Sequence, residues 1–243
     1  MAIFLYTDFG SGDVYVGQVK AVLQEHAPDL AVVDLLHDAP AFNVRAGAHL
    51  LAALAHHLPA GSVVVAVVDP GVGSERRPVA VHADERWYVG PDNGLLSVLV
   101  SRAARARIYD ITWRPVRLSS SFHGRDLFAP IAGMLARSAA PSGGMKEQAA
   151  GLEVSFGADD LPEIIYMDHF GNAMTGLRPA HVDVAQRLHL GARRLAYARV
   201  FSEVKTGAAF WYVNSLGLAE IAVRGGSAAQ ILKLKIGQRV RLV

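Results

Sequence analysis

A carboxylate and a guanidinium, at Asp69 and Arg76, lie seven residues apart in the run 69–77. The run contains a proline and two glycines, and such a tight loop lets the backbone approach a ligand. Loops held on a rigid scaffold often carry function, so we predict a site here. The alternative is a structural turn with Asp69 as its cap. The run is not a P-loop, because the Gly-Lys-Ser/Thr ending is missing.

Two other positions combine a reactive side chain with a break in the chain pattern. Asp8 follows the apolar run 3–6, and a carboxylate at a strand end can hold two vicinal hydroxyls such as those of a ribose. The alternative is that Asp8 caps the next helix. His123 lies in Phe-His-Gly-Arg-Asp, residues 122–126, where an imidazole can move a proton near neutral pH.

Polar residues also gather in two expected turns, Asp-His-Phe-Gly-Asn at 168–172 and Asn-Ser-Leu-Gly at 214–217. Asn and Gly are common in turns for conformational reasons, and taken alone each run is explained that way. A metal cluster of Asp8, Asp69, His123 and Asp168 is a further possibility. The sequence has no His-x-His or His-Glu-x-x-His spacing, so we expect no metal.

Alternating strand and helix patterns must position these residues. In the first part of the chain, strand-like runs at 3–6, 30–35, 63–68, 87–89 and 107–111 alternate with helical patterns at 12–25 and 44–58, and a further helix begins near Arg125. This order predicts a layered α/β domain over residues 1–157 with a central, mostly parallel sheet. Short strands separated by turn residues follow, and they predict a smaller β domain over 158–243, a barrel or a sandwich.

Composition excludes several classes of protein. The 243 residues have a net charge of +2 and no cysteine, so disulfides and thiolate metal sites are ruled out. Basic residues form no stripe with interleaved aromatics, which argues against nucleic-acid binding. No apolar run approaches the roughly 20 residues that cross a bilayer, and the N-terminus is typical of a first strand rather than a signal peptide. We therefore expect a cytoplasmic protein that does not act at membranes.

Seven motifs, in order along the chain, resemble the S-adenosylmethionine hydroxide adenosyltransferases, relatives of the fluorinating and chlorinating adenosyltransferases. They are Thr-Asp-Phe-Gly (7–10), Tyr-Val-Gly (15–17), Val-Asp-Pro-Gly-Val-Gly (68–73), Pro-Asp-Asn-Gly (91–94), Phe-His-Gly-Arg-Asp (122–126), Asp-His-Phe-Gly-Asn (168–172) and Asn-Ser-Leu-Gly (214–217). The resemblance implies an N-terminal α/β domain, a C-terminal β-barrel, and a homotrimer whose site lies between neighbouring subunits.

The resemblance also implies roles for single residues. Asp69, Arg76 and His123 would handle the attacking water, with Arg76 favoured over Arg77 by its seven-residue offset from Asp69. Asp8 would bind the ribose hydroxyls with Phe42 nearby, Phe170 and Asn172 would contact adenine, Asp168 would take the methionine ammonium, and Ser215 its carboxylate. The full set of substrate-binding residues is Asp8, Phe42, Asp168, Phe170, Asn172, Tyr212, Asn214 and Ser215.

The implied reaction is hydrolysis of S-adenosyl-L-methionine to adenosine and L-methionine, with no cofactor. Water attacks the ribose C5′, Asp69 or His123 accepts its proton, and Arg76 stabilises developing hydroxide charge. One alternative is a halogenase on the same fold, against which Asp69 argues because a carboxylate repels halide. Another is a non-catalytic sensor of S-adenosylmethionine or adenosine. An unrelated α/β hydrolase would need a Gly-x-Ser-x-Gly elbow, which is absent.

Overall fold

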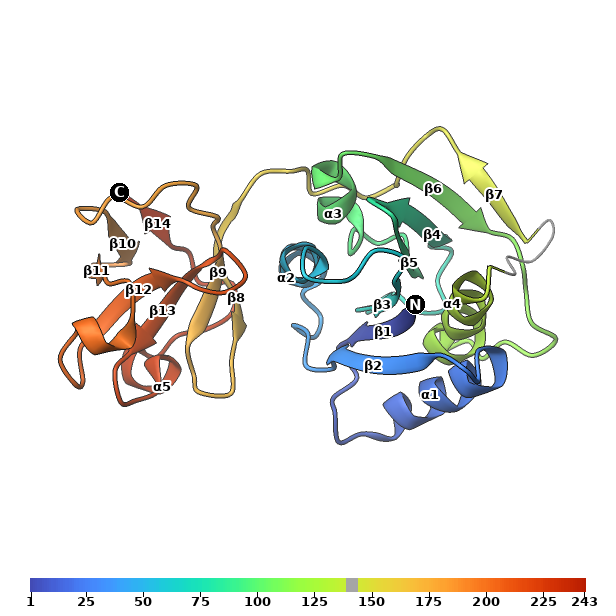
Figure 1. Cartoon of the computed structure of the whole chain (residues 1–243), viewed down its shortest axis with the longest axis horizontal. Coiled ribbons are helices and arrows are strands. Elements are labelled where there is room, and N and C mark those ends of the chain that lie inside the picture. Colours follow the sequence, from blue (N-terminus) through green and yellow to red (C-terminus); the bar gives the residue numbers. More distant parts are fainter. Residues whose placement is uncertain (139–143) are drawn as a thin grey trace. The chain divides into compact units, whose positions relative to one another are not determined.

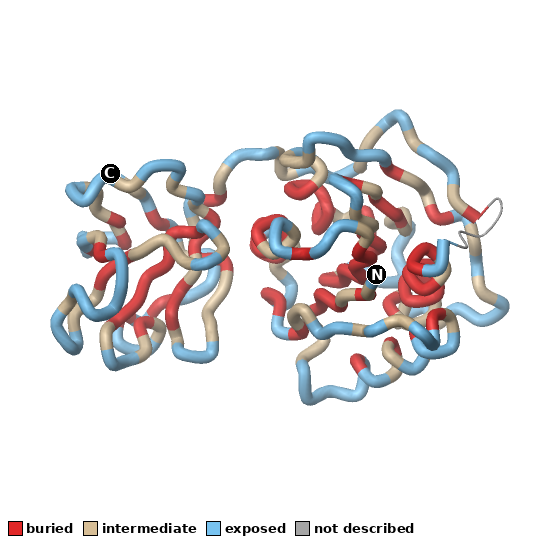
Figure 2. The backbone as a smooth tube through the Cα atoms, viewed as in Figure 1, coloured by how far each residue is buried: buried red, intermediate tan, exposed pale blue. Residues whose placement is uncertain are grey.

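The computed structural model describes residues 1–138 and 144–243. The chain divides into two compact units, Met1–Ala158 and Asp159–Val243, each with its own sheet. The buried segments of each unit are chiefly the central strands and the helices packed on them, whereas the connecting loops are exposed (Figure 2). No helix in these two ranges is both long enough and apolar enough to span a bilayer.

The sheet of the first unit has seven strands in the order β2-β1-β3-β5-β4-β6-β7 (Figure 1). They are β1 (Ala2–Thr7), β2 (Ala31–Leu36), β3 (Val63–Val67), β4 (Pro78–Ala83), β5 (Arg86–Pro91), β6 (Ala106–Ile111) and β7 (Met145–Gln148). Strands β2, β1, β3 and β5 are parallel neighbours, and β4, β6 and β7 extend the sheet with antiparallel pairings. Every residue of β3 is buried, as expected of an apolar strand covered on both faces.

Helices α1 (Val14–His26) and α4 (Ala129–Ala136) lie on one side of this sheet, and α2 (Val44–Ala55) and α3 (Ser97–Arg102) lie on the other (Figure 1). Side chains alternate between the faces of a strand. Ile3 and Leu5 of β1 therefore share a buried cluster with α1 and α4. Tyr6 faces α2 instead, and its hydroxyl donates to the Gly47 carbonyl oxygen at 2.8 Å.

The starts of two helices follow from single side chains. Asn43 caps α2, because its Oδ1 accepts a hydrogen bond from the Ala46 N–H at 3.1 Å. The cap of α1 is Asp13, whose Oδ1 accepts from the Val14 N–H at 2.6 Å. Asp8 is therefore not the cap of this helix. The helix near Arg125 begins with one π-helical turn, Gly124–Phe128, and continues as α4.

The second unit is a seven-stranded sheet in the order β14-β10-β11-β12-β13-β9-β8. The elements are β8 (Leu161–Met167), β9 (Ala173–Gly176), β10 (Arg187–Leu190), β11 (Arg193–Tyr197), β12 (Ala209–Val213), β13 (Ala219–Val223), α5 (Ala228–Leu232) and β14 (Arg241–Leu242). Residues 237–240, just before β14, hydrogen-bond to β8 at the opposite end of the sheet: Ile164 N–H donates to the Gln238 oxygen and Val240 N–H to the Pro162 oxygen, both at 2.9 Å. The sheet thus nearly closes, which confirms the predicted α/β domain followed by a smaller barrel-like domain.

Candidate active site

Asp8 and Asp69 follow the carboxyl ends of the neighbouring parallel strands β1 and β3. Thr7 is in register with Val67, and the Asp8 N–H donates to the Val67 carbonyl oxygen at 3.3 Å. Since parallel strands end at one edge of a sheet, the two carboxylates are brought together there. Burial raises the pKa of Asp8 above its ordinary value, and the nearby negative charge of Asp69 raises it further.

Arg76 forms a bidentate ion pair with Asp69. Its Nε lies 3.0 Å from Oδ1 and 2.9 Å from Oδ2 of the carboxylate, and its Nη2 also contacts Oδ2. The pair is removed from solvent, with 8% of the Arg76 side chain and 4% of the Asp69 side chain exposed. The guanidinium also lies over the Phe128 ring, 5.4 Å from its centroid. This geometry fixes the orientation of the Asp69 carboxylate.

The adjacent Arg77 has different partners. It donates to Asp92 at 2.6 Å and to Asp110 at 3.2 Å, and the Asp92 side chain is fully buried. These bonds tie the start of β4 to the end of β5 and to β6. Of the two arginines, Arg76 is therefore the one beside Asp69, and Arg77 belongs to a structural network.

His123 lies next to Arg76, with 3.0 Å between Arg76 Nη2 and His123 Nδ1. A guanidinium can only donate, so Nδ1 accepts and the neutral imidazole carries its proton on Nε2. Burial lowers the pKa of His123 below its ordinary value, and the positive charge of Arg76 lowers it further. The structure thus brings together Asp69, Arg76 and His123, the three residues singled out for handling water.

Gly73 allows the loop of Asp69 and the loop of His123 to approach closely. Its φ is +82°, and a Cβ there would collide with the Ser120 carbonyl oxygen. Only glycine adopts this conformation without strain and leaves that space free. In the neighbouring segment, Arg125 and Asp126 pair with each other, so His123 is the residue of the 122–126 motif that faces Asp69 and Arg76.

A cavity of about 70 Å³ opens beside these groups. The lining residues are Asp8, Phe9, Val67, Asp69, Val72, Ser121, Phe122, His123 and Gly124. One water needs about 10–15 Å³ of such space, so the cavity holds a few waters and is too small for a nucleoside. It combines an apolar wall with two carboxylates and an imidazole, which suits a small polar nucleophile.

Asp8 is held in place by a chain of hydrogen bonds that the sequence did not reveal. The Thr7 hydroxyl lies 2.8 Å from His37 Nδ1, and His37 Nε2 lies 2.9 Å from Asp34 Oδ1. The His37 carbonyl oxygen also accepts from the Gly10 N–H at 2.7 Å. Thr7 and His37 are 1% and 5% exposed, so these two buried residues hold the loop on both sides of Asp8, while Asp34 at the end of the hydrogen-bond chain is exposed.

In the second unit, four of the predicted residues line one open cavity of about 670 Å³. They are Asp168, Phe170, Asn172 and Tyr212, and they are joined there by Phe201, Val223, Gly225, Gly226 and Ser227. Asp168 accepts from the Asn172 backbone N–H at 2.7 Å and from Asn172 Nδ2 at 2.9 Å. The Phe170 side chain is 75% exposed at the turn. Gly171 packs so closely on Ser227 that a side chain would clash, which fixes the turn against the start of α5.

Asn214 and Ser215 do not line this cavity. The Asn214 amide oxygen accepts from the N–H groups of Leu216 and Leu218 at 2.9 and 3.0 Å, which shapes the loop that exposes Ser215. The Asn214 amide nitrogen donates to Glu220 at 2.6 Å. Sequence reasoning missed Glu220, although a Glu inside the apolar strand 218–223 was a signal that it has a buried partner.

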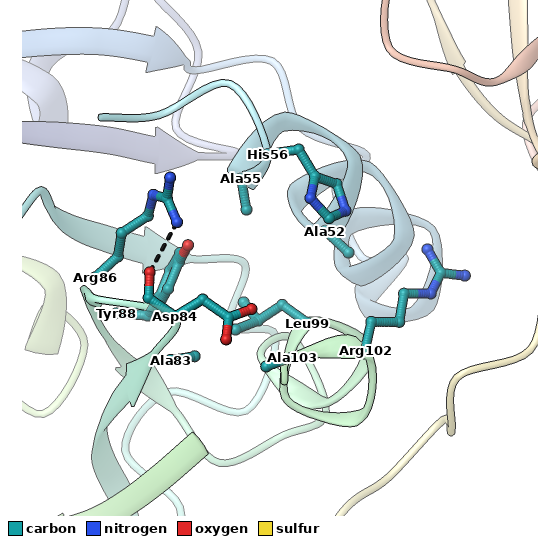
Figure 3. Close-up of a pocket in the computed structure, with 10 residues that line it drawn as sticks. All are labelled: Ala52, Ala55, His56, Ala83, Asp84, Arg86, Tyr88, Leu99, Arg102 and Ala103. Atoms are coloured by element: carbon teal, nitrogen blue, oxygen red, sulfur yellow. Dashed lines mark hydrogen bonds between the residues drawn. The ribbon is translucent and has the colours of Figure 1, made fainter. Parts of the chain in front are cut away.

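Phe42 has a φ of +60° and is 86% exposed, and it is not among the residues lining the cavity beside Asp69. A pocket of about 40 Å³ lies beside α2, α3 and the β4–β5 turn, where Arg86 donates to the Asp84 carbonyl oxygen (Figure 3). None of the predicted site residues lines it. Within residues 1–138 and 144–243, no three His, Asp or Glu side chains are grouped to hold a metal ion.

Two sequence families match the two units. The SAM hydroxide adenosyltransferase N-terminal domain matches residues 3–143, and the C-terminal domain of the same name matches residues 162–241. The chain belongs to the SAM hydroxide adenosyltransferase family.

Individual relatives agree with this membership. The chain is 43% identical to a (R)-S-adenosyl-L-methionine hydrolase of Thermus thermophilus, over 99% of both chains. It is 26% identical to a fluorinase of Actinopolyspora mzabensis, over 99% of this chain and 96% of the fluorinase. A crystal structure of an uncharacterized conserved protein from Thermotoga maritima superposes with a TM-score of 0.88 at 31% identity, covering 100% of this chain and 99% of the other.

Proposed function

We propose that this protein hydrolyses S-adenosyl-L-methionine to adenosine and L-methionine. The observation that carries the proposal is the buried Asp69–Arg76 pair with His123 on the guanidinium, beside a cavity that holds only a few waters. The hydrolases of this family are also its more similar relatives, at 43% identity against 26% for the fluorinase. A halide would meet the Asp69 carboxylate at close range, which disfavours halogenation.

Asp69 is the proton acceptor in this proposal, and His123 is a hydrogen-bond donor. Nδ1 of His123 already accepts from Arg76, and its lowered pKa keeps the ring neutral with the proton on Nε2. The Nε2–H then orients the water oxygen while Asp69 takes one of its protons. Arg76 stabilises the negative charge that develops on that oxygen.

The reaction needs no cofactor, because every bond that forms is matched by one that breaks. The water oxygen forms a bond to the ribose C5′, and the C5′–sulfur bond breaks with its electron pair left on sulfur. The sulfonium becomes the neutral thioether of methionine, and the proton on Asp69 returns to solvent. Because attack must be in line with the departing sulfur, positioning of water and substrate supplies much of the rate.

Different substrate-binding residues contact different parts of the substrate in this proposal. Asp8 takes the ribose hydroxyls with Phe42 packed nearby, and Phe170 and Asn172 contact the adenine. Asp168 takes the methionine ammonium and Ser215 the carboxylate, with Tyr212 and Asn214 supporting this end. Asp8 and the water-handling residues belong to the first unit and the amino-acid contacts to the second. On the family resemblance, the proposal also includes a homotrimer in which neighbouring subunits share each site, and an enzyme acting in the cytoplasm.

The reaction is tested by the fate of solvent oxygen. Incubation with S-adenosyl-L-methionine in heavy-oxygen water is expected to give adenosine and methionine in equal amounts, with the label in the 5′ hydroxyl. Mass spectrometry of the purified adenosine measures it. Unlabelled adenosine would contradict attack by water at C5′. Formation of 5′-chloro-5′-deoxyadenosine in high chloride would identify a halogenase, and binding without products a sensor.

The acid side of the pH profile tests the role of His123. Protonation of Nδ1 breaks its contact with Arg76 and adds a positive charge beside the guanidinium, so activity should fall as His123 becomes charged. Burial and Arg76 lower this pKa, so kcat in excess substrate should persist as pH falls to 6.5, the ordinary histidine value, and decline only below it. The measurement is kcat from pH 5 to 8. A loss of activity centred above the ordinary value would contradict the assignment.

A further inference from the structure

Glu220, the second residue of β13, is a buried carboxylate. Its residue is 2% exposed, and its neighbours Ala219 and Ile221 are apolar and fully buried. An ionised group in such a place is costly unless it is paired and hydrogen-bonded. Packing of the apolar core therefore does not explain why a Glu occupies this position.

Both oxygens of Glu220 accept short hydrogen bonds. The Tyr212 hydroxyl donates to Oε1 at 2.6 Å, and Asn214 Nδ2 donates to Oε2 at 2.6 Å. Tyr212 lies directly opposite on β12 and lines the 670 Å³ cavity. Two donors on the two oxygens are the partners that an ionised carboxylate needs, and they fix the Tyr212 ring and the loop after Asn214 at the same time.

Asp168 lines this cavity, and its negative charge acts on Glu220, which does not itself line the cavity. Burial raises the pKa of Glu220 above its ordinary value, and the charge of Asp168 raises it further. The pKa of the Tyr212 hydroxyl is raised by burial and by both carboxylates. No cationic side chain is among the residues lining the cavity, and none donates to Glu220 or Asp168 in the hydrogen bonds of the described residues. A positive charge that enters the cavity would therefore favour the ionised form of Glu220 as well as that of Asp168.

We propose that Glu220 is a specificity-determining residue, which positions Tyr212 and Asn214 and makes the cavity around Asp168 select ligands that carry the ammonium group of an amino-acid end. This inference rests on the proposed function, which supplies the ligand. A cationic group that enters the cavity relieves the repulsion between the two carboxylates, and this relief adds to its binding energy. A nucleoside without the amino-acid end gains none of it.

The Glu220→Gln variant removes the charge and keeps the shape. The Tyr212 hydroxyl can reverse to accept from the new amide, whose oxygen still accepts from Asn214. Asp69→Asn is added to the protein with Glu220 and to the Glu220→Gln variant, so that turnover is suppressed in both. Each full-length protein is then titrated by calorimetry with S-adenosyl-L-methionine and with adenosine. We expect the affinity for S-adenosyl-L-methionine to fall about 10- to 100-fold and that for adenosine to change less than about two-fold. Turnover with Asp69 intact should show the loss in KM rather than in kcat.

Glu163→Gln is the matched control. Glu163 is also a strand glutamate of the second unit, on β8, and does not line the cavity. It should change neither affinity. If Glu220→Gln lowers the affinities for both ligands equally, or lowers neither affinity, the proposed role of Glu220 in selection is wrong. If the protein with Glu220 intact binds no S-adenosyl-L-methionine, the proposed function fails and this inference fails with it.

Discussion

Replacing Asp69 with Ala is expected to lower kcat by about 10²- to 10⁴-fold, the usual effect of losing a proton acceptor. The substitution removes both the acceptor and the anchor of Arg76, whose Nε bonds to the two carboxylate oxygens at 3.0 and 2.9 Å. The KM for S-adenosyl-L-methionine should change little, because Asp69 acts on the nucleophile and not on the substrate. Initial rates of adenosine formation over a range of substrate concentrations measure both constants.

The controls separate chemistry from binding and folding. Asp69→Asn keeps the shape and loses the charge, and it should lose most of the activity as well. His123→Ala should also act mainly on kcat. Asp8→Ala should act mainly on KM, because Asp8 holds the ribose hydroxyls and does not take the proton of the attacking water. Thermal unfolding shows whether each variant is folded, and full turnover by folded Asp69→Ala protein would remove the water-handling assignment of Asp69, Arg76 and His123.

Mixing two inactive variants is expected to restore activity if neighbouring subunits share the site. Asp69→Ala damages the first unit, and Asp168→Ala damages the second. In a three-fold ring with head-to-tail contacts, a site can combine the intact first unit of one chain with the intact second unit of its neighbour. Random mixing of equal amounts makes about a quarter of the sites intact. The variants are unfolded together, refolded, and assayed for adenosine formation.

The result distinguishes two architectures. If each site were built within one chain, every site in the mixture would carry one lesion and the mixture would stay inactive. Each variant refolded alone sets the background, and refolded wild-type protein sets the recoverable maximum. Native mass spectrometry confirms that mixed trimers form. Mixed trimers without activity would contradict the shared site, and a monomeric active enzyme would contradict the trimer.

Much of the architecture follows from local sequence pattern. The apolar runs that became β1 and β3 are recognisable because strands buried on both faces need continuous apolar side chains. Once these strands are parallel neighbours, the residues that follow them must meet, and this brings Asp8 and Asp69 together. The Asn43 cap is equally local, since its partner is three residues away. Strands β4 and β7 escaped prediction, because Pro78 and the charged residues 146–147 interrupt the apolar pattern.

The sequence by itself determined the two-part fold, the ordered motifs and the residue types that can activate water. Only the tertiary structure decided which groups meet. Arg76 and Arg77 are adjacent and chemically identical, yet one pairs with Asp69 and the other with Asp92. The same holds for the tautomer of His123, set by an arginine 47 residues away, and for Glu220, whose partners lie across a strand pair. Hydrogen bonds and charges act over a few ångströms in space, and chain separation does not encode that distance.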